Sequence, residues 1–567
     1  MNKLPLGIYT FDKVRNGSFL YIDKTKIIYD LIKITEPILL TRPKRFGKTL
    51  LLSTIKKIFQ GQKNLFKGLW LYNQHYNWPC YPIIHLDMAK VNCRDLTSFR
   101  QTLVTQLTRQ IKAANLKVKG EDPVGIFHSF ITDLKIAYQQ QVVVLIDEYD
   151  LPIIHNIITY PQELAQLWEE LVTFYGVLEV SKEDLRFVFI TGVNRFERQS
   201  FFPILSSLRD ITFEPKFAGI CGVSEAEFDS RFPPYLEVVM STMEAEDPMM
   251  GKPSYNKLRA SLWDWYGGYS WDGKTKLINL FFLLHFFRAK ELNNFWHTTK
   301  TPTKLINLIR KHEQALNLFG QDLRLKPEES YLAPHNLLPV PVLLQNGYLS
   351  VSKASKHLSH TVFNLSFPNC STRWLLFIYM MAKAFNGKAG HLWTEIDQLL
   401  RSIRNQNPTV TAMAFKRLLT SLRYRADYSI QFYYRQIFLY TMSILGQLTL
   451  VDEQNGQTFI NGLIKVNEKT FIALQMSHHK LDLHLSAVEA DEYDGDNHAL
   501  DIDDEWRFPS KEILAYEEQL TGQAEDSLAR LDKYEFVIKC KLKDCQLIKM
   551  ALVVHNSSVL KVLFKRD

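Results

Sequence analysis

The stretch Pro37–Leu50, with the sequence PILLTRPKRFGKTL, decides the fold class of the first third of the chain. It begins as an apolar run that predicts a buried strand and continues as a basic turn that ends in Gly47-Lys48-Thr49. Apolar residues then recur at helical spacing. A helix that starts directly after such a turn offers free N–H groups and the positive end of its dipole to an anion. The order of strand, turn and helix therefore predicts a phosphate-binding loop.

Each residue type at the end of this turn suits one task at a bound nucleotide. Gly47 lets the backbone approach a phosphate, Lys48 would reach the β- and γ-phosphates, and Thr49 would place its hydroxyl on Mg²⁺. The pattern G-x-x-x-x-G-K-T is incomplete, because Arg42 stands where its first glycine is expected. The alternative is a basic turn before an ordinary amphipathic helix. The nucleotide-binding residues that we predict are Arg45, Phe46, Gly47, Lys48, Thr49 and Leu50.

A second signal lies at the end of the apolar run Val142–Ile146, which continues as DEYD over residues 147–150. Open α/β sheets bind ligands at the carboxyl ends of their strands, so the first two carboxylates fall at the expected edge. Asp147 is suited to hold Mg²⁺ with Thr49, and Glu148 is suited to orient and polarise the attacking water. Adjacent carboxylates repel each other unless a cation or a proton compensates, and a metal gives the pair a reason to coexist here. The alternative is a solvated strand end.

The fourth apolar run of the first third ends in TGVNR, residues 191–195. A polar group at the tip of this strand can sense the γ-phosphate, and we expect Asn194 in this role, with Thr191 as the second choice. An arginine can stabilise the charge of the transition state from the same subunit or a neighbouring one, and the candidates are Arg195 and Arg209. Equally, these arginines can simply solvate the edge of the sheet.

The pattern of apolar residues changes along the chain. Unbroken apolar runs separated by helix-sized segments predict a parallel α/β sheet in the first third, because such strands are buried on both faces. Helical spacing dominates from about 225 to 330, and residues 337–365 predict a helix followed by a two-stranded wing. The predicted strands are 37–40, 83–87, 142–146, 185–190, 457–466, 470–476, 536–541 and 547–554; the predicted later helices are 277–287, 304–316, 374–385 and 433–445.

Several segments together resemble one family, the AAA-ATPase-like family of largely uncharacterised microbial proteins. The similar segments are Leu4–Gly7, Tyr21–Thr25, Arg42–Thr49, Asp147–Asp150, Thr191–Val193, Tyr266–Tyr269, Phe295–Trp296, Thr301–Thr303 and Leu343–Leu349. In that family too, an arginine replaces the first glycine of the phosphate loop. The resemblance implies a P-loop NTPase fold with ATP and Mg²⁺ as cofactors.

The resemblance also implies a domain order, because the family usually carries a PD-(D/E)XK nuclease-like domain at its C-terminus. Residues 1–225 would form an AAA-like P-loop ATPase domain and 226–330 a helical lid. Residues 331–425 would form a winged-helix-like and helical connector, and 426–567 a nuclease-like α+β domain.

The nuclease-like domain is expected to have lost its catalytic residues. Asn461 stands where an aspartate is expected, Leu474 where the second acid is expected, and Met476 where a lysine is expected. Mg²⁺ binds anionic oxygens, which none of these side chains provides. The alternative ligands are acids of an insertion over about 477–520, such as Asp482, Glu489 and Asp491.

Two weaker clusters have simple explanations. His478, His479 and His484 are compatible with a zinc site, but surface histidines are the better interpretation because no cysteine or regular spacing supports a metal. An aromatic cluster in the middle of the chain is better explained by core packing than by stacking on nucleic-acid bases. Its members are Trp263, Trp265, Tyr266, Tyr269 and Trp271.

Composition agrees with a packed globular protein. Of 567 residues, 46% are hydrophobic and 23% charged, which excludes a mainly disordered chain, and a net charge of +8 does not by itself indicate nucleic acid. The six cysteines form no C-x-x-C pair, no export signal is recognised, and the most apolar run, Leu277–Phe287, is too short to cross a bilayer. We therefore expect a cytoplasmic protein outside the membrane.

The leading hypothesis is an ATP-binding, ATP-hydrolysing regulatory switch coupled to the degenerate nuclease-like domain. That domain would bind DNA or a protein partner, and a homo-oligomer is compatible with the sequence. One alternative is an ATP-gated, Mg²⁺-dependent DNA nuclease, and another is a nucleotide-binding module without turnover.

Overall fold

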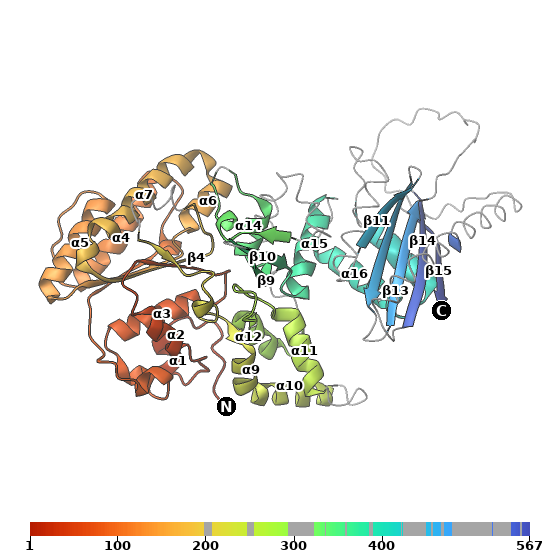
Figure 1. The fold of residues 1–567 in the computed structure, drawn as a ribbon, viewed down its shortest axis with the longest axis horizontal. Coiled ribbons are helices and arrows are strands. Elements are labelled where there is room, and N and C mark those ends of the chain that lie inside the picture. Colours follow the sequence, from red (N-terminus) through yellow and green to blue (C-terminus); the bar gives the residue numbers. More distant parts are fainter. Residues whose placement is uncertain are drawn as a thin grey trace, which may run out of the picture. The chain divides into compact units, whose positions relative to one another are not determined.

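The computed structural model is drawn as a ribbon in Figure 1. It describes residues 1–197, 207–246, 254–292, 323–334, 336–357, 360–384, 389–420, 422, 449–454, 457–465, 470–478, 524–525, 546–555 and 558–566. The chain divides into two compact units, Met1–Leu375 and Leu376–Asp567, and each is described by itself. The four domains expected from the sequence, and the three boundaries between them, stay predictions.

The first unit is built around a five-stranded parallel sheet with the order β2-β3-β4-β1-β5, as in P-loop proteins. β1 and β3 are buried along their whole length, as unbroken apolar runs require. The four strands predicted from these runs are confirmed, and β5 is an addition. The bounds are β1 Ile38–Thr41, β2 Ile83–Asp87, β3 Val142–Asp147, β4 Leu185–Gly192 and β5 Arg209–Asp210.

Helices cover both faces of this sheet, with α1, α2 and α3 on one face and α4, α5 and α7 on the other (Figure 1). α3 begins at Lys48, directly after the predicted phosphate loop, and buries the apolar positions that its spacing predicted. Asp95 and Asp122 cap α4 and α5 by accepting hydrogen bonds from backbone N–H groups. The bounds are α1 Phe11–Asn16, α2 Thr25–Leu31, α3 Lys48–Phe59, α4 Leu96–Ala113, α5 Pro123–Tyr138, α6 Leu151–Thr159 and α7 Leu164–Val180.

The remainder of the first unit contains helices and two small antiparallel sheets. The short strands β6 and β7 pair, and β8, β10 and β9 form a second sheet. The predicted helix and two-stranded wing are confirmed as α14 and the hairpin β9–β10, whereas the predicted helix 304–316 lies outside the described residues. The bounds are β6 Val223–Ser224, α9 Glu225–Arg231, α10 Pro233–Glu246, α11 Tyr255–Tyr266, β7 Leu277–Ile278, α12 Leu280–Ala289, β8 Leu323–Leu325, α14 Pro339–Gln345, β9 Ser350–His357 and β10 His360–Ser366.

The second unit contains helices and a five-stranded mixed sheet with the order β11-β12-β13-β14-β15, in which only β13 and β14 pair in parallel. Three predicted strands are confirmed, whereas 536–541 and the helix 433–445 lie outside the described residues. α15, Cys370–Ala384, spans the division between the units. The other bounds are α16 Ala389–Arg404, α17 Pro408–Thr420, β11 Thr449–Gln454, β12 Gln457–Lys465, β13 Thr470–His478, β14 Gln546–His555 and β15 Ser558–Arg566.

The register of β12 and β13 locates the three positions assigned to a nuclease site. Asn461 pairs with Gln475, which lies between Leu474 and Met476 on β13. The acids proposed as alternative ligands, Asp482, Glu489 and Asp491, and the histidines 479 and 484 lie outside the described residues.

Candidate functional site

The predicted phosphate loop joins the end of β1 to the first turn of α3. Gly47 has a φ of +97°, a backbone conformation that favours glycine, and it is exposed; a Cβ atom added there would meet no atom of a non-adjacent residue within 4 Å. Lys48 is buried, and its Nζ donates hydrogen bonds to the carbonyl oxygens of Arg42 at 2.9 Å and Pro43 at 3.2 Å. The lysine ammonium is therefore held against the backbone of its own loop.

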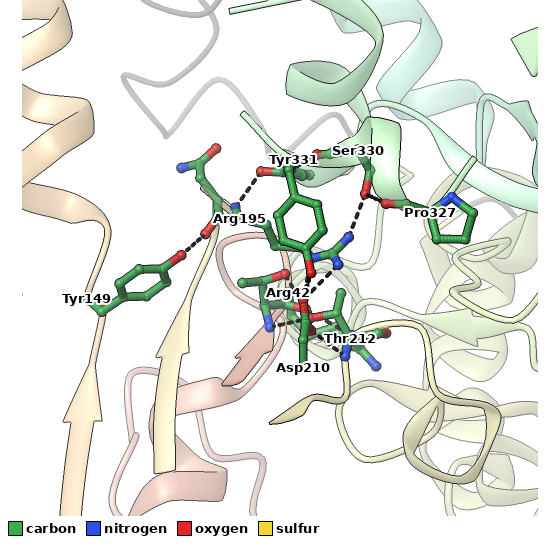
Figure 2. Close-up of polar contacts among 11 residues, drawn as sticks. Arg42, Tyr149, Arg195, Asp210, Thr212, Pro327, Ser330 and Tyr331 are labelled. Atoms are coloured by element: carbon green, nitrogen blue, oxygen red, sulfur yellow. Dashed lines mark hydrogen bonds and ion pairs between the residues drawn. The ribbon is translucent and has the colours of Figure 1, made fainter. Parts of the chain in front are cut away.

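Arg42 turns its side chain into the protein interior. Its guanidinium donates to the carbonyl oxygens of Thr41 at 2.8 Å, Thr212 at 2.9 Å and Phe217 at 3.3 Å, and it lies 4.1 Å from the ring centroid of Trp271. Figure 2 shows Arg42 beside Thr212. Burial lowers the pKa of Arg42 to about 10, so the group is still a cation at neutral pH. Arginine at the usual glycine position therefore anchors the loop to the segment that follows β5.

The other predicted loop residues differ in exposure. Phe46 is buried, and its ring packs against Tyr269 at 4.9 Å and Trp271 at 5.1 Å, which agrees with a core role for these aromatic residues. Arg45 is exposed, donates to the hydroxyl of Tyr9 at 3.2 Å and lies over the ring of Phe281 at 4.7 Å. Leu50 is half-buried.

The acidic end of β3 faces the phosphate loop directly. The Thr49 hydroxyl donates to Oδ2 of Asp147 at 2.8 Å, and the Thr191 hydroxyl donates to Oδ1 of the same carboxylate at 2.5 Å. Thr49 is exposed, whereas Asp147 is buried. A hydroxyl oxygen beside a carboxylate is the kind of oxygen set that Mg²⁺ takes from a protein when phosphates and waters complete its shell. These residues therefore fit a magnesium ion held jointly with a nucleotide.

Glu148 has an unusual backbone conformation beside this carboxylate. Its φ of +54° lies in the left-handed region, which a non-glycine residue adopts only when its surroundings hold it there. The side chain is half-buried. Burial raises the pKa of the Glu148 carboxyl, and the nearby Lys48 ammonium opposes that rise. A carboxylate of raised pKa beside a lysine and a second carboxylate is chemically suited to accept a proton from water.

Asn194 and Arg195 are engaged by residues outside the phosphate loop. The Asn194 amide donates to Oδ2 of Asp150 at 2.7 Å and accepts from Nδ2 of Asn346 at 3.3 Å. Arg195 is buried and forms an ion pair with Asp210 at 2.7 Å, and this pairing outweighs the burial and raises the pKa of the arginine. Arg209, the other candidate, pairs with Glu214 at 2.9 Å.

Several residues of this neighbourhood were missed by sequence reasoning. Asp150 ends the acidic run and is buried, and its carboxylate accepts hydrogen bonds from the residues after β4. Gln345 and Asn346 lie in the segment Leu343–Leu349, which the family resemblance singled out without assigning a role. That resemblance was the only signal that could have pointed to them.

Comparison with known proteins matches the part of the chain that contains these site residues. Residues 5–202 match the model of a family described as predicted AAA-ATPase. This AAA-ATPase-like segment contains β1 to β4, the phosphate loop and the acidic strand end, so nucleotide binding is supported at the level of the family. The match does not reach the residues assigned to a nuclease-like domain.

A curated relative extends the similarity beyond the AAA-ATPase-like segment. Over 373 residues, the chain is 29% identical to a protein of Azotobacter chroococcum mcd 1 named "Uncharacterized protein in vnfD 5'region". The matched region covers 65% of this chain and 68% of the relative. No solved structure matches.

None of the helices in the described ranges has both the length and the apolar composition that crossing a bilayer requires. Within the same ranges, no three His, Cys, Asp or Glu side chains gather as a metal site.

Proposed function

We propose that the AAA-ATPase-like segment binds Mg²⁺-ATP and hydrolyses it slowly, as a regulatory switch. The observation that carries this proposal is the contact at 2.8 Å between the Thr49 hydroxyl and the Asp147 carboxylate, beside the buried Lys48. A phosphate loop and a magnesium-anchoring acid have to meet in this way for one ion to be shared with the nucleotide. The family match supports the nucleotide as the ligand.

Each group in the site has a defined task in this proposal. Lys48 leaves the carbonyl oxygens of Arg42 and Pro43 and donates to the β- and γ-phosphates instead. Thr49 and Asp147 hold the ion, which supplies positive charge to the phosphate oxygens when bound. Glu148 orients the attacking water and accepts its proton, and its raised pKa suits it to that task.

Lys48→Ala tests the binding step. We expect calorimetry on the full chain to show at least a 100-fold weaker affinity for Mg²⁺-ATP, because two charge-assisted hydrogen bonds to phosphate are together worth about 3 kcal/mol or more. Lys67→Ala, at an exposed lysine beyond the end of α3, is the matched control and should bind like the wild type. Normal nucleotide binding by Lys48→Ala would refute the assignment.

Glu148→Gln tests the hydrolytic step. The variant keeps the shape of the side chain but has no carboxylate to accept a proton, so we expect phosphate release to fall about 100-fold or more while ATP binding persists. Wild-type phosphate release no faster than that of the variant would favour a nucleotide-binding module without turnover.

For residues 426–567, which belong to the second unit, we propose a nuclease-like domain that binds DNA or a protein partner without cutting DNA. The side chains of Asn461, Leu474 and Met476 support this proposal, because they supply no anionic oxygen for Mg²⁺. Incubation of the full chain with duplex DNA, Mg²⁺ and ATP tests it. Cleavage that is lost when Asp482, Glu489 and Asp491 are replaced by alanine would establish the alternative, an ATP-gated nuclease.

A further inference from the structure

The acidic end of β3 is tied to the residues that follow β4 by several hydrogen bonds. The backbone N–H of Tyr149 donates to the Thr191 carbonyl oxygen at 2.9 Å, and the Tyr149 hydroxyl donates to the Asn194 carbonyl oxygen at 2.9 Å. The Asp150 carboxylate accepts from the backbone N–H groups of Val193 at 3.1 Å and Asn194 at 2.8 Å. Glu148 directly precedes these anchors, so its position depends on residues 191–194.

The Asn194 side chain connects this acidic turn to α14. Its Nδ2 donates to Oδ2 of Asp150 at 2.7 Å, and its Oδ1 accepts from Nδ2 of Asn346 at 3.3 Å. Nδ2 of Asn346 also donates to the Val342 carbonyl oxygen at 2.9 Å. An amide nitrogen has two hydrogens, and these two acceptors use both of them. The orientation of each amide is therefore determined by its partners.

The two neighbours of Asn346 contact other parts of the same site. Gln345 accepts a hydrogen bond from the backbone N–H of Arg195 at 2.7 Å. Gly347 has a φ of +80°, and a Cβ built on it would lie 2.8 Å from Cγ of Pro43 in the phosphate loop. Three consecutive residues, 345–347, thus contact the phosphate loop and the tip of β4 together.

A buried ion pair holds the preceding segment in the same place. Arg195 pairs with Asp210, its guanidinium donates to the Ser330 hydroxyl, and it lies 4.0 Å from the ring centroid of Tyr331 (Figure 2). The Tyr331 hydroxyl donates to Asp210 at 3.1 Å. Gln345 donates to the Ser330 carbonyl oxygen. This packing fixes the turn 345–347 relative to the sheet.

We propose that Asn346 is a positioning residue of the nucleotide site, acting on Glu148 through Asn194 and Asp150. The proposal rests on the proposed ATPase function. ATP turnover then requires the turn 345–347 to keep its contacts with the nucleotide site. The hairpin β9–β10 begins at Ser350, shortly after this turn, and is linked to turnover through it. The residue lies outside the AAA-ATPase-like segment 5–202, so a later part of the chain completes the site.

A double-mutant cycle tests this role. The full chain is compared as wild type, Asn346→Ala, Asn194→Ala and the double variant, with kcat and KM measured from phosphate release. We expect Asn346→Ala to lower kcat about tenfold with KM within about twofold, because small misplacements of catalytic groups reduce the rate without reducing binding. The double variant should be no slower than Asn194→Ala, because Asn346 acts through Asn194.

Two further variants make the test specific. Asn346→Asp keeps the shape of the side chain but replaces its donor by an acceptor facing Oδ1 of Asn194, so it should lose at least as much turnover as Asn346→Ala. Asn336→Ala is the matched control at an exposed asparagine ten residues earlier, and its kcat should equal that of the wild type. Melting temperatures of all variants identify any general loss of folding.

Each outcome decides the proposal. A kcat of Asn346→Ala or Asn346→Asp equal to that of the wild type would overturn it, and so would effects of the two alanine substitutions that simply multiply. Those results would leave the ATPase function standing. A wild-type protein that neither binds ATP nor releases phosphate would overturn the ATPase function and this inference with it.

Discussion

Replacing Arg42 by glycine restores the complete pattern G-x-x-x-x-G-K-T, and the pattern alone predicts a better phosphate loop. The structure predicts a large loss of stability instead. The Arg42 guanidinium is buried, donates to three backbone carbonyl oxygens within 3.3 Å and lies over the ring of Trp271. Glycine removes all of these contacts and leaves the carbonyl oxygens of Thr212 and Phe217 without this donor.

The size of the loss follows from these contacts. Hydrogen bonds from a charged donor are worth about 1.5–3 kcal/mol each, and a desolvated cation over an aromatic ring adds about 2 kcal/mol. Burying the charged guanidinium has a cost in free energy, which is visible as the lowered pKa of Arg42. Glycine removes this cost together with the contacts, so part of the lost contact energy is offset. We expect a net loss of about 4 kcal/mol in the free energy of unfolding. That is a large fraction of the roughly 5–15 kcal/mol that keeps a domain folded.

Urea unfolding of the full chain, followed by tryptophan fluorescence, measures this loss. Arg42→Lys keeps the charge but not the planar fork of donors, so we expect an intermediate loss of about 2 kcal/mol. Arg45→Ala, at an exposed arginine of the same loop, is the matched control and should change the free energy of unfolding by less than about 1 kcal/mol. An Arg42→Gly protein within about 1 kcal/mol of the wild type would refute the reasoning.

Three other residues carry predictions for stability. Glu148→Gln should raise the melting temperature at pH 8. Burial raises the pKa of this carboxyl, so its ionised form destabilises the folded state at any pH above the pKa that the carboxyl has in the unfolded chain. A lower melting temperature of the variant would contradict this. Burial lowers the pKa of His85 to about 4. The stability of the wild type should therefore decrease as the pH falls from about 6.5 to 4, and His85→Gln should lose less stability over that window in urea titrations. Parallel curves of stability against pH for the two proteins would exclude the effect. Gly347→Ala should lower the free energy of unfolding by about 3 kcal/mol, because the residue has a positive φ and the added Cβ would collide with Pro43. Gly68→Ala should lower it by only about 1 kcal/mol, because Gly68 has a φ of +81° but open space around it. Equal losses for the two variants would show that the collision does not matter.

The parallel sheet and the turn from β1 into α3 were predictable because their signals are local. A strand buried on both faces needs an unbroken apolar run, and β3 has one over Val142–Ile146. Asp147 directly follows this run and therefore lies at the carboxyl edge of the sheet, where the Thr49 hydroxyl donates a hydrogen bond to it. β5 was not predicted, because the two residues Arg209–Asp210 are too short to show any periodicity.

The surroundings of Asn194 and Arg195 were not predictable, because their partners are distant in sequence. Asn346 and Gln345 contact them across about 150 residues, and no local pattern encodes that packing. A polar residue at a strand tip has the same sequence signature whether it faces a phosphate or another side chain. The assignment of Asn194 as a γ-phosphate sensor and of Arg195 as a transition-state arginine stays a prediction.

Arginine at position 42 is compatible with a phosphate loop because the loop needs its glycine elsewhere. Left-handed backbone falls at Arg45 and Gly47, with φ values of +68° and +97°, whereas the backbone of Arg42 is outside that region. A side chain at position 42 therefore meets no backbone restriction, and in this fold it has an interior to fill, lined by the carbonyl oxygens of Thr212 and Phe217. The carbonyl oxygen of the same residue accepts a hydrogen bond from Lys48. One residue thus links the lysine of the loop to the segment after β5, a connection that glycine at position 42 cannot make.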